Sequence, residues 1–226
     1  MLCENFYQMS IGLKRTALAA GLAAASIISP VKADDSGFYL TGSVGVSNQD
    51  ESTWTSRSDS TVKGKVDFDE SAGVFNGGLG YDFGSFRVEA TLGKTNGDLD
   101  KYQVTGPTKL AAADASGNYT LESVFLSGYY DISLGDSKFS PYLGGGIGRT
   151  NVDIESLTTG GVTLAGDNDV VTSYQGTIGV SYAATENSDV FVQGQYQSIG
   201  KAEEILSSNF EDLSNLRASL GLRFRF

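Results

Sequence analysis

The segment Asn215–Phe226, "NLRASLGLRFRF", alternates apolar and polar residues along its length. Its apolar positions are Leu216, Ala218, Leu220, Leu222, Phe224 and Phe226, and its polar positions include Arg217, Ser219, Arg223 and Arg225. Successive side chains of a β-strand point to opposite faces, so this period of two predicts a strand with one apolar and one polar face. Which of the two faces meets water decides the fold.

Seven further segments show the same alternation. The eight predicted strands cover residues 37–47, 74–83, 86–94, 120–131, 140–148, 173–183, 190–197 and 215–226. Three connections are short, namely Gly84–Ser85, Ser133–Ser137 and Ala184–Ser188. The other four are long and polar, and they cover residues 48–69, 95–117, 150–169 and 198–214. Short turns at one end and long loops at the other are typical of an outer-membrane barrel. The sequence therefore predicts an all-β, eight-stranded, antiparallel up-and-down transmembrane barrel.

A soluble barrel, such as a lipocalin, is the alternative, because its strands alternate in the same way. A soluble barrel carries charge on its outer face and apolar residues inside. Here the polar faces of residues 173–183 and 190–197 carry glutamine, serine and threonine, and the tyrosines lie near the ends of the apolar faces. This distribution favours lipid outside and polar side chains inside. The residues predicted to face lipid are Phe86, Val88, Leu92, Val190, Val192, Leu216, Leu220 and Leu222.

Residues 1–33 have the pattern of a cleaved signal peptide. A basic start at Lys14 and Arg15 precedes an apolar run that is shorter than the ~20 residues of a membrane-spanning helix. We expect cleavage between Ala33 and Asp34, which leaves residues 34–226 as the barrel domain. A buried N-terminal helix is the alternative reading, and a start at Met9 would give a more ordinary signal length. The single cysteine, Cys3, would be removed with the signal peptide, so the exported chain would rely on its hydrogen-bonded barrel for stability.

The sequence also resembles a known family. The stretches "GYDFGSFRVEATLG" (Gly80–Gly93), "SPYLGGGIG" (Ser140–Gly148) and "GVSYAATENSDVFVQGQYQ" (Gly179–Gln197) resemble opacity-type surface antigens and the related small OmpA-like outer-membrane barrels. The ending, with Ser219, Gly221, Phe224 and Phe226, resembles the signal that the barrel assembly machinery reads in that family. Two features depart from the family. Gln195 stands where an arginine is common, and we expect no peptidoglycan-binding domain after Phe226, so the cell-wall tether of OmpA-like proteins is not expected here.

Composition limits the chemistry that the chain can perform. It has 16 Lys and Arg against 27 Asp and Glu, and this acidic balance argues against nucleic acid as a partner. It has no histidine, so a Ser–His nucleophile and a histidine-bearing zinc site are both excluded. Asp67 and Asp69 are interpreted as solvated charge in a polar loop, and the glycines of "GGGIG" as sites of close packing. We therefore expect no enzyme activity, no metal and no cofactor.

Charges on the polar faces should meet inside the barrel. The expected network comprises Asp82, Arg87, Glu89, Asp131, Arg217, Arg223 and Arg225. Because an unpaired buried charge is costly, Glu89 is expected to pair with Arg223 or Arg225, and Arg87 to lie near Asp82 or Asp131. Such a network would act as a structural plug or, alternatively, as the gate of a very narrow pore.

These patterns predict a non-enzymatic protein of the cell outer membrane. Its four polar, acidic loops would serve envelope integrity, adhesion or a surface-antigen role. A narrow porin-like channel for ions or small solutes is the second hypothesis. The expected partners are outer-membrane lipid, the barrel assembly machinery through the last strand, and a host, phage or surface ligand at the loops.

Overall fold

The computed structural model describes residues 36–56, 61, 63–68, 71–105, 113–159, 162–200, 208–210 and 213–226. Their regular structure consists of β-strands. The strands are β1 (Gly37–Gln49), β2 (Ser52–Ser56), β3 (Lys63–Phe68), β4 (Ala72–Asp82), β5 (Phe86–Thr105), β6 (Ala113–Ser116), β7 (Asn118–Asp131), β8 (Phe139–Thr159), β9 (Val162–Ala183), β10 (Ser188–Ile199), β11 (Ser208–Phe210) and β12 (Leu213–Arg225). No helix among these residues is long and apolar enough to span a membrane.

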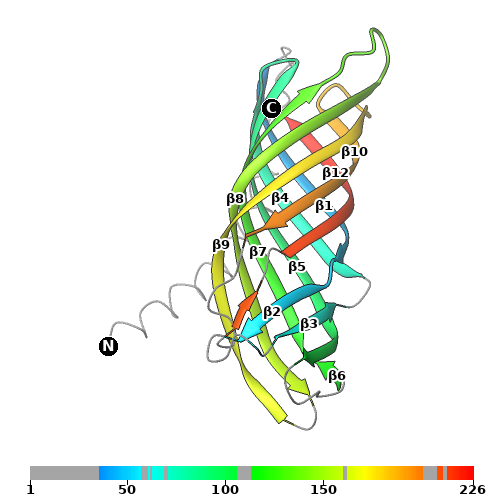
Figure 1. Ribbon diagram of the computed structural model, residues 1–226. Coiled ribbons are helices and arrows are strands. Elements are labelled where there is room, and N and C mark those ends of the chain that lie inside the picture. Colours follow the sequence, from blue (N-terminus) through cyan, green and yellow to red (C-terminus); the bar gives the residue numbers. More distant parts are fainter. Residues whose placement is uncertain are drawn as a thin grey trace, which may run out of the picture. The chain divides into compact units, whose positions relative to one another are not determined.

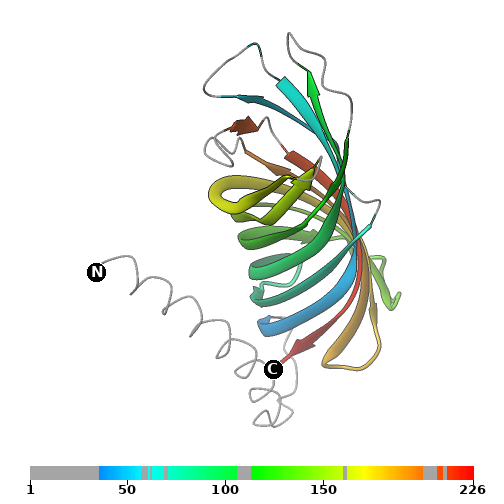
Figure 2. The ribbon, with the colours of Figure 1, turned by 90° about the horizontal axis from the view of Figure 1, so that it is seen from below.

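Eight of the strands form a closed ring of antiparallel neighbours. The ring order is β1, β4, β5, β7, β8, β9, β10 and β12. The first and last strands close it, from the pair Tyr39 and Arg225 to the pair Gln49 and Asn215. Figures 1 and 2 show the tilted strands curving into this barrel. The predicted eight-stranded up-and-down barrel is therefore confirmed.

The long connections differ from the loops that the sequence predicted. β5, β8 and β9 run for 20, 21 and 22 residues, whereas a tilted strand needs about 9–11 residues to cross a membrane. β2, β3 and β11 add a small sheet to the outer part of β5, and β6 joins β5 to β8. Much of residues 48–69, 95–117, 150–169 and 198–214 is thus strand. We call this region, the small strands with the outer parts of β5, β8 and β9, the head.

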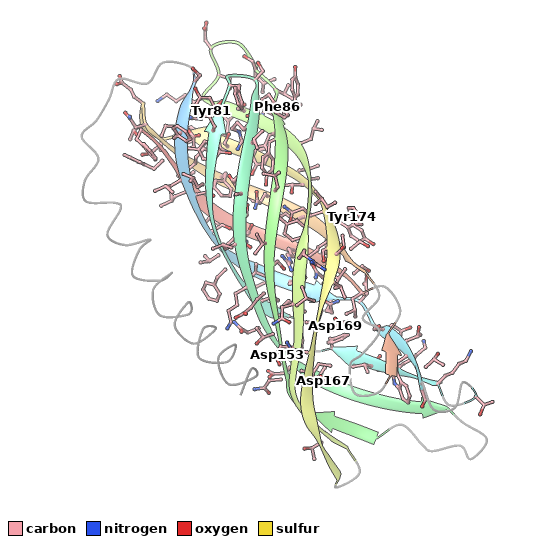
Figure 3. The ribbon with its side chains drawn as sticks, turned by 90° about the vertical axis from the view of Figure 1, so that its left-hand side faces the viewer. Tyr81, Phe86, Asp153, Asp167, Asp169 and Tyr174 are labelled. Atoms are coloured by element: carbon pink, nitrogen blue, oxygen red, sulfur yellow. The ribbon has the colours of Figure 1, made fainter. Side chains whose placement is uncertain are left out.

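The outward face of the barrel carries a continuous apolar band. Of the positions predicted to face lipid, Phe86, Leu92, Val192, Leu216, Leu220 and Leu222 are exposed, and Val88 and Val190 are partly exposed on the same face. Aromatic rings cluster at the short-turn end, where Tyr81 packs between Phe38 and Phe83. Figure 3 shows Tyr81 and Phe86 at this end of the band and Tyr174 toward the head. The band therefore has aromatic residues near both of its edges, as a lipid-facing surface does.

Candidate functional site

The lumen near the short turns is occupied by ion pairs. Arg87 on β5 binds Asp131 at the end of β7 through both Nε and Nη2, with Nη2 3.0 Å from Oδ1. Arg223 on β12 donates from Nη1 to Asp189 on β10 at 3.0 Å. The side chains of Arg87, Arg223 and Asp189 are at most 3% exposed. A bidentate arginine–carboxylate pair in such a setting is strong and geometrically restrictive, so this level of the lumen is rigid.

Asp189 is the centre of the network, because two arginines share it. Arg225 donates to it from Nη1 at 3.0 Å, and its Nη2 lies 2.7 Å from the carboxylate. Arg225 also reaches Asp82, which accepts a hydrogen bond from the turn amide of Gly84 at 2.9 Å. The carboxylates of the short turns are thereby linked to the last strand. Asp189 was not predicted from the sequence, although it alternates with Phe191 and Gln193 on the inward face of β10.

Aromatic rings surround the buried guanidinium groups. The Arg87 guanidinium lies 4.9 Å from the ring centre of Tyr129 and 5.1 Å from that of Tyr142. Arg223 lies 5.4 Å from the ring of Tyr39 and 5.8 Å from that of Phe191. These distances suit cation–π attraction, which is stronger where the cation is removed from water. The rings therefore fill the lumen and also stabilise its charge.

Glycines make room for these rings on the neighbouring strands. A Cβ atom at Gly80 would lie 2.2 Å from Cζ of Tyr39, and one at Gly144 would lie 2.3 Å from Cδ1 of Tyr129. Real side-chain atoms do not approach so closely, so both positions require glycine. Gly144 belongs to the "GGGIG" stretch, which the sequence analysis interpreted as a site of close packing.

Glu89 does not form its predicted ion pair. Its Oε1 accepts a hydrogen bond from Thr91 Oγ1 at 3.0 Å, while Arg223 and Arg225 bind Asp189 instead. The pairing register explains the difference, because Arg223 is the direct partner of Asp189 across β10 and β12. Register partners on neighbouring strands form a row around the barrel, and in the row of Glu89 the next two residues before Arg225 are Gly80 and Tyr39. The Tyr39 ring projects over Gly80 and so lies between Glu89 and Arg225. Arg87 meets Asp131, one of its two predicted neighbours.

A layer of uncharged polar side chains lies above the charged level. Thr150 Oγ1 is within 3.1 Å of Ser123 Oγ, Ser173 Oγ and Gln197 Nε2. Arg217 points into this layer in register with Ser47 and Gln195, and it is 4% exposed. Its Nε and Nη2 have no hydrogen-bond partner among the described side chains. Of the predicted network, Arg217 is thus placed apart from the other arginines.

The head end of the lumen is apolar, which the sequence analysis did not predict. Its buried cluster is formed by Trp54, Val66, Ala72, Leu99, Tyr119, Leu121, Val152, Ile154, Val171, Ile199 and Leu213. Phe68 packs against this cluster, with its ring 5.0 Å from that of Tyr119. The inward-facing positions of the strands therefore change from polar to apolar where the strands leave the outward apolar band. The head has its own hydrophobic core.

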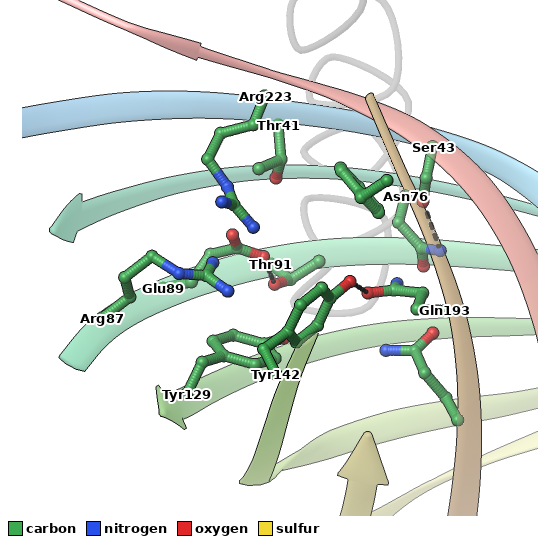
Figure 4. Close-up of a pocket in the computed structure, with 12 residues that line it drawn as sticks. Thr41, Ser43, Asn76, Arg87, Glu89, Thr91, Tyr129, Tyr142, Gln193 and Arg223 are labelled. Carbon is green, nitrogen blue, oxygen red and sulfur yellow. Dashed lines mark hydrogen bonds between the residues drawn. The ribbon is translucent and has the colours of Figure 1, made fainter. Parts of the chain in front are cut away.

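Two of the cavities lined by the described residues are small and lie inside the barrel. One, of about 20 Å³, is lined by Glu89, Arg223 and Gln195 among others, and Figure 4 shows Glu89 and Arg223 facing each other across it. The other, also about 20 Å³, lies within the apolar cluster beside Tyr119 and Leu213. A water molecule needs roughly 10–15 Å³ of such space, so each cavity has room for about one. Neither cavity can therefore hold a ligand much larger than a water molecule.

The remaining predicted site residues belong to the signal cleavage site and to the last strand. Ala33 and Asp34 lie outside the described residues. Ser219 is buried and faces the lumen, whereas Phe224 and Phe226 are exposed. A Cβ at Gly221 would lie 2.3 Å from Cζ of Phe191. No group of three or more histidine, cysteine, aspartate or glutamate side chains that could hold a metal ion occurs in the described parts of the chain.

Comparisons with known proteins agree with this architecture. The model of the outer membrane protein beta-barrel domain matches residues 16–226. Major surface antigen 4 of Anaplasma marginale is 31% identical over 146 residues, which are 55% of this chain and 46% of that protein. The chain therefore matches less than half the length of this curated relative.

Two solved structures are similar in fold. Neisserial surface protein A gives a TM-score of 0.52 at 20% identity, over 84% of this chain and 97% of that one. OprG from Pseudomonas aeruginosa gives a TM-score of 0.52 at 16% identity, over 87% of this chain and 99% of that one. At such identities the likeness concerns the fold alone.

Proposed function

The chain belongs to the family of outer membrane proteins with a beta-barrel domain, and from that membership we propose that it is a non-enzymatic surface protein that presents a rigid, acidic head outside the cell. Family membership indicates the outer membrane as its location. In the proposed orientation, the short turns face the periplasm and the head faces the outside of the cell, as in other barrels of this type.

The observation that carries the proposal is the apolar core of the head. Trp54, Leu99 and Ile154 come from three different strands and meet beyond the lipid-facing band. Burial of each such side chain stabilises the folded head by roughly 1.5–3 kcal/mol. Loops that merely connect strands are not expected to contain a buried cluster of this kind. The core holds the outer parts of β5, β8 and β9 in fixed positions, so the head offers a constant surface to a partner.

The charge of that surface indicates the kind of partner. Asp153 lies on the outward face of the outer part of β8, and Asp167 and Asp169, labelled with it in Figure 3, lie half-exposed on the inward face of β9 opposite Ile154 and Val152. Of the two lysines on β3, Lys63 is exposed, whereas the charge of half-exposed Lys65 is offset by Glu51, which accepts a hydrogen bond from Lys65 Nζ and raises the pKa of that lysine. With a net charge of −11 for the whole chain, complementarity favours a basic surface on a host, phage or abiotic ligand.

The channel hypothesis is the weaker of the two. The ion pairs around Asp189, the polar layer around Thr150 and the apolar core of the head lie one above another in the same lumen. A plug of this kind opposes passage of ions, since each bidentate pair would have to open. We also propose, from the resemblance of the last strand, that the barrel assembly machinery reads the ending at Phe226 before β12 pairs with β1.

Single-cysteine labelling tests the proposed display of the head. The cysteine of the full chain, Cys3, lies within the predicted signal peptide, so introduced cysteines are read without background. Asn168→Cys lies on the exposed outer part of β9, and Asp136→Cys lies in the exposed turn between β7 and β8. A membrane-impermeant maleimide should label Asn168→Cys on intact cells and Asp136→Cys only after lysis. The reverse pattern would disprove the orientation.

A conductance measurement tests the alternative. Purified barrel in a planar bilayer should give no reproducible conductance steps. Discrete steps that disappear when the protein is omitted would favour the channel over the display protein.

A further inference from the structure

Arg149 occupies an unusual position on the outward face of β8. It is exposed and stands in register with Val124 on β7 and Thr172 on β9. Val124 is in turn the partner of Leu92 on β5, and both are exposed apolar side chains of the lipid-facing band. Arg149 thus lies in an apolar row near the head end of the lipid-facing band. A cation at this depth is tolerated because its long side chain can extend toward the headgroups, where a charge is much less costly than at the bilayer midplane.

The next row toward the head shows how a neighbouring cation is neutralised. Lys94 is the register partner of Glu122, and its Nζ lies 3.5 Å from Oε1 of that carboxylate. Arg149 has no ion pair or side-chain hydrogen bond within the described part of the chain. Lys94 and Arg149 therefore lie at a similar depth, but the charge of Lys94 is balanced by Glu122 whereas the charge of Arg149 has no ion-pair partner among the described residues.

The surroundings of Arg149 fit a lipid. Ile147 and Tyr174 form the row directly below it, and both are exposed. The row beneath contains Gly145 and Gly176, which are paired in register and leave the backbone uncovered on the outward face. An acyl chain below a headgroup at Arg149 would meet apolar side chains first and bare backbone next.

The rim on the other side of the barrel differs. The last outward residues of β10, β12 and β1 toward the head are uncharged, namely Ser198, Ser214 and Asn48. The unpaired cation is therefore confined to the β7–β9 side, so any attraction for an anion is directional.

We propose that Arg149 binds the phosphate of an anionic lipid in the outer leaflet, and that this contact gives the β7–β9 side of the barrel a preferred lipid neighbour. A guanidinium presents its donors in a planar fork that matches two phosphate oxygens. The proposal rests on the outward orientation of the head given above for the choice of leaflet, but the interaction itself depends only on the lipid-facing band.

Fluorescence quenching by brominated lipids measures this preference locally. Tyr174→Trp in a Trp54→Phe background places a single tryptophan one row below Arg149. The full refolded barrel is reconstituted in vesicles of brominated phosphatidylglycerol mixed with phosphatidylcholine, and then with the bromine on the choline lipid. The two quenching curves give the relative association constant of the anionic and zwitterionic lipid beside the probe. A basic residue at a membrane surface contributes about 1 kcal/mol, or about fivefold. We expect a preference of that order for phosphatidylglycerol.

Matched variants separate a specific contact from a change of net charge. Arg149→Gln should reduce the preference to near one, whereas Lys94→Gln, which removes the same charge in the adjacent row, should leave it unchanged. Glu122→Gln frees Lys94 and should restore part of the preference in the Arg149→Gln background. Equal losses for Arg149→Gln and Lys94→Gln, or no loss for Arg149→Gln, would overturn the proposal.

A competition experiment identifies the source of the phosphate. Inorganic phosphate and sodium chloride at equal ionic strength should weaken the preference equally, because both act by screening. If inorganic phosphate alone abolished it, Arg149 would be a site for free phosphate and the lipid proposal would fail. The quenching measurement uses purified protein in vesicles, so a negative result would not bear on the proposed surface display. Conversely, a failure of the maleimide labelling test on cells would not affect the interpretation of the quenching measurement.

Discussion

Asp189→Asn should destabilise the barrel strongly, because it removes the charge that two arginines share. Asp189 is 3% exposed and binds Arg223, which is equally buried, and Arg225, which is 26% exposed. After the substitution Arg225 keeps its contact with Asp82, whereas Arg223 loses the carboxylate with which it forms its ion pair. Removing one partner of a buried ion pair costs about 3–5 kcal/mol. We expect a loss in that range for the free energy of unfolding.

Urea unfolding of barrels reconstituted in vesicles provides the measurement. The folded fraction is read from the difference in gel mobility between unheated folded barrel and unfolded chain. Lys94→Gln is the matched control, since it breaks a half-exposed pair on the outer surface that contributes about 0–1 kcal/mol.

A double substitution tests the electrostatic origin of the effect. Asp189→Leu with Arg223→Met replaces the pair by apolar side chains, and such replacements are often close to neutral. The double variant should therefore be more stable than Asp189→Leu alone. If Asp189→Asn cost no more than Lys94→Gln, the lumen would be screened by water and the rigid plug described above would be refuted.

Four further outcomes are expected. Leu220→Arg should lower the free energy of unfolding by about 2–4 kcal/mol, the penalty of arginine near the bilayer midplane. Ser219→Arg faces the lumen, so its cost should depend on the space available there. Urea unfolding in short-chain and long-chain lipids distinguishes the two variants, because only the cost of Leu220→Arg should vary with bilayer thickness. Trp54→Ala should weaken the head by about 3–5 kcal/mol, detected as faster limited proteolysis of the head while the barrel keeps its folded gel mobility. Phe226→Ala should slow assembly in cells, followed by pulse-labelling, but leave folding into detergent micelles nearly unchanged; equal rates in cells would contradict a recognition role. N-terminal sequencing of protein from the outer-membrane fraction should begin at Asp34, and a retained Met1 would contradict export by a cleaved signal.

The barrel itself could be predicted because alternation alone decides which face each residue occupies. Among the consecutive apolar residues 124–126, alternation places Val124 and Leu126 on one face, and both are exposed on the outward face while Phe125 is buried. A strand that is polar inside and apolar outside leaves this period in the sequence whatever its partners are. Strand count and ring closure then follow, because an open edge is not tolerated in lipid.

The head could not be predicted because its alternation is reversed and spread over short segments. Val152 and Ile154 point into the lumen while Asn151 and Asp153 point outward. In sequence this stretch looks like a polar loop, since half of its residues are charged or polar. Only the register between β8 and β9, which continues from Phe139 to Thr159, shows that the same strands extend beyond the lipid.

The ion pairs were predicted in type, and Arg87 meets one of its two predicted partners, but the partner predicted for Glu89 was wrong. Sequence shows which charges face inward, yet the partner of each depends on the stagger between strands around a closed barrel. Arg223 meets Asp189 because those residues face each other directly across β10 and β12. The intervening ring of Tyr39 keeps Glu89 from Arg225, and no pattern in one strand reveals a side chain that projects from another.

The core of the head has a consequence for the order of folding. Its residues range from Trp54 on β2 to Leu213 on β12, and they include members of β5, β7, β8, β9 and β10. Contacts between such distant parts of the chain form slowly, because the entropy of closing long loops is lost before they stabilise anything. The head therefore consolidates only after the last strand has arrived. Until then its apolar side chains stay accessible to chaperones and proteases, so an intact head distinguishes a completed molecule from an unfinished one.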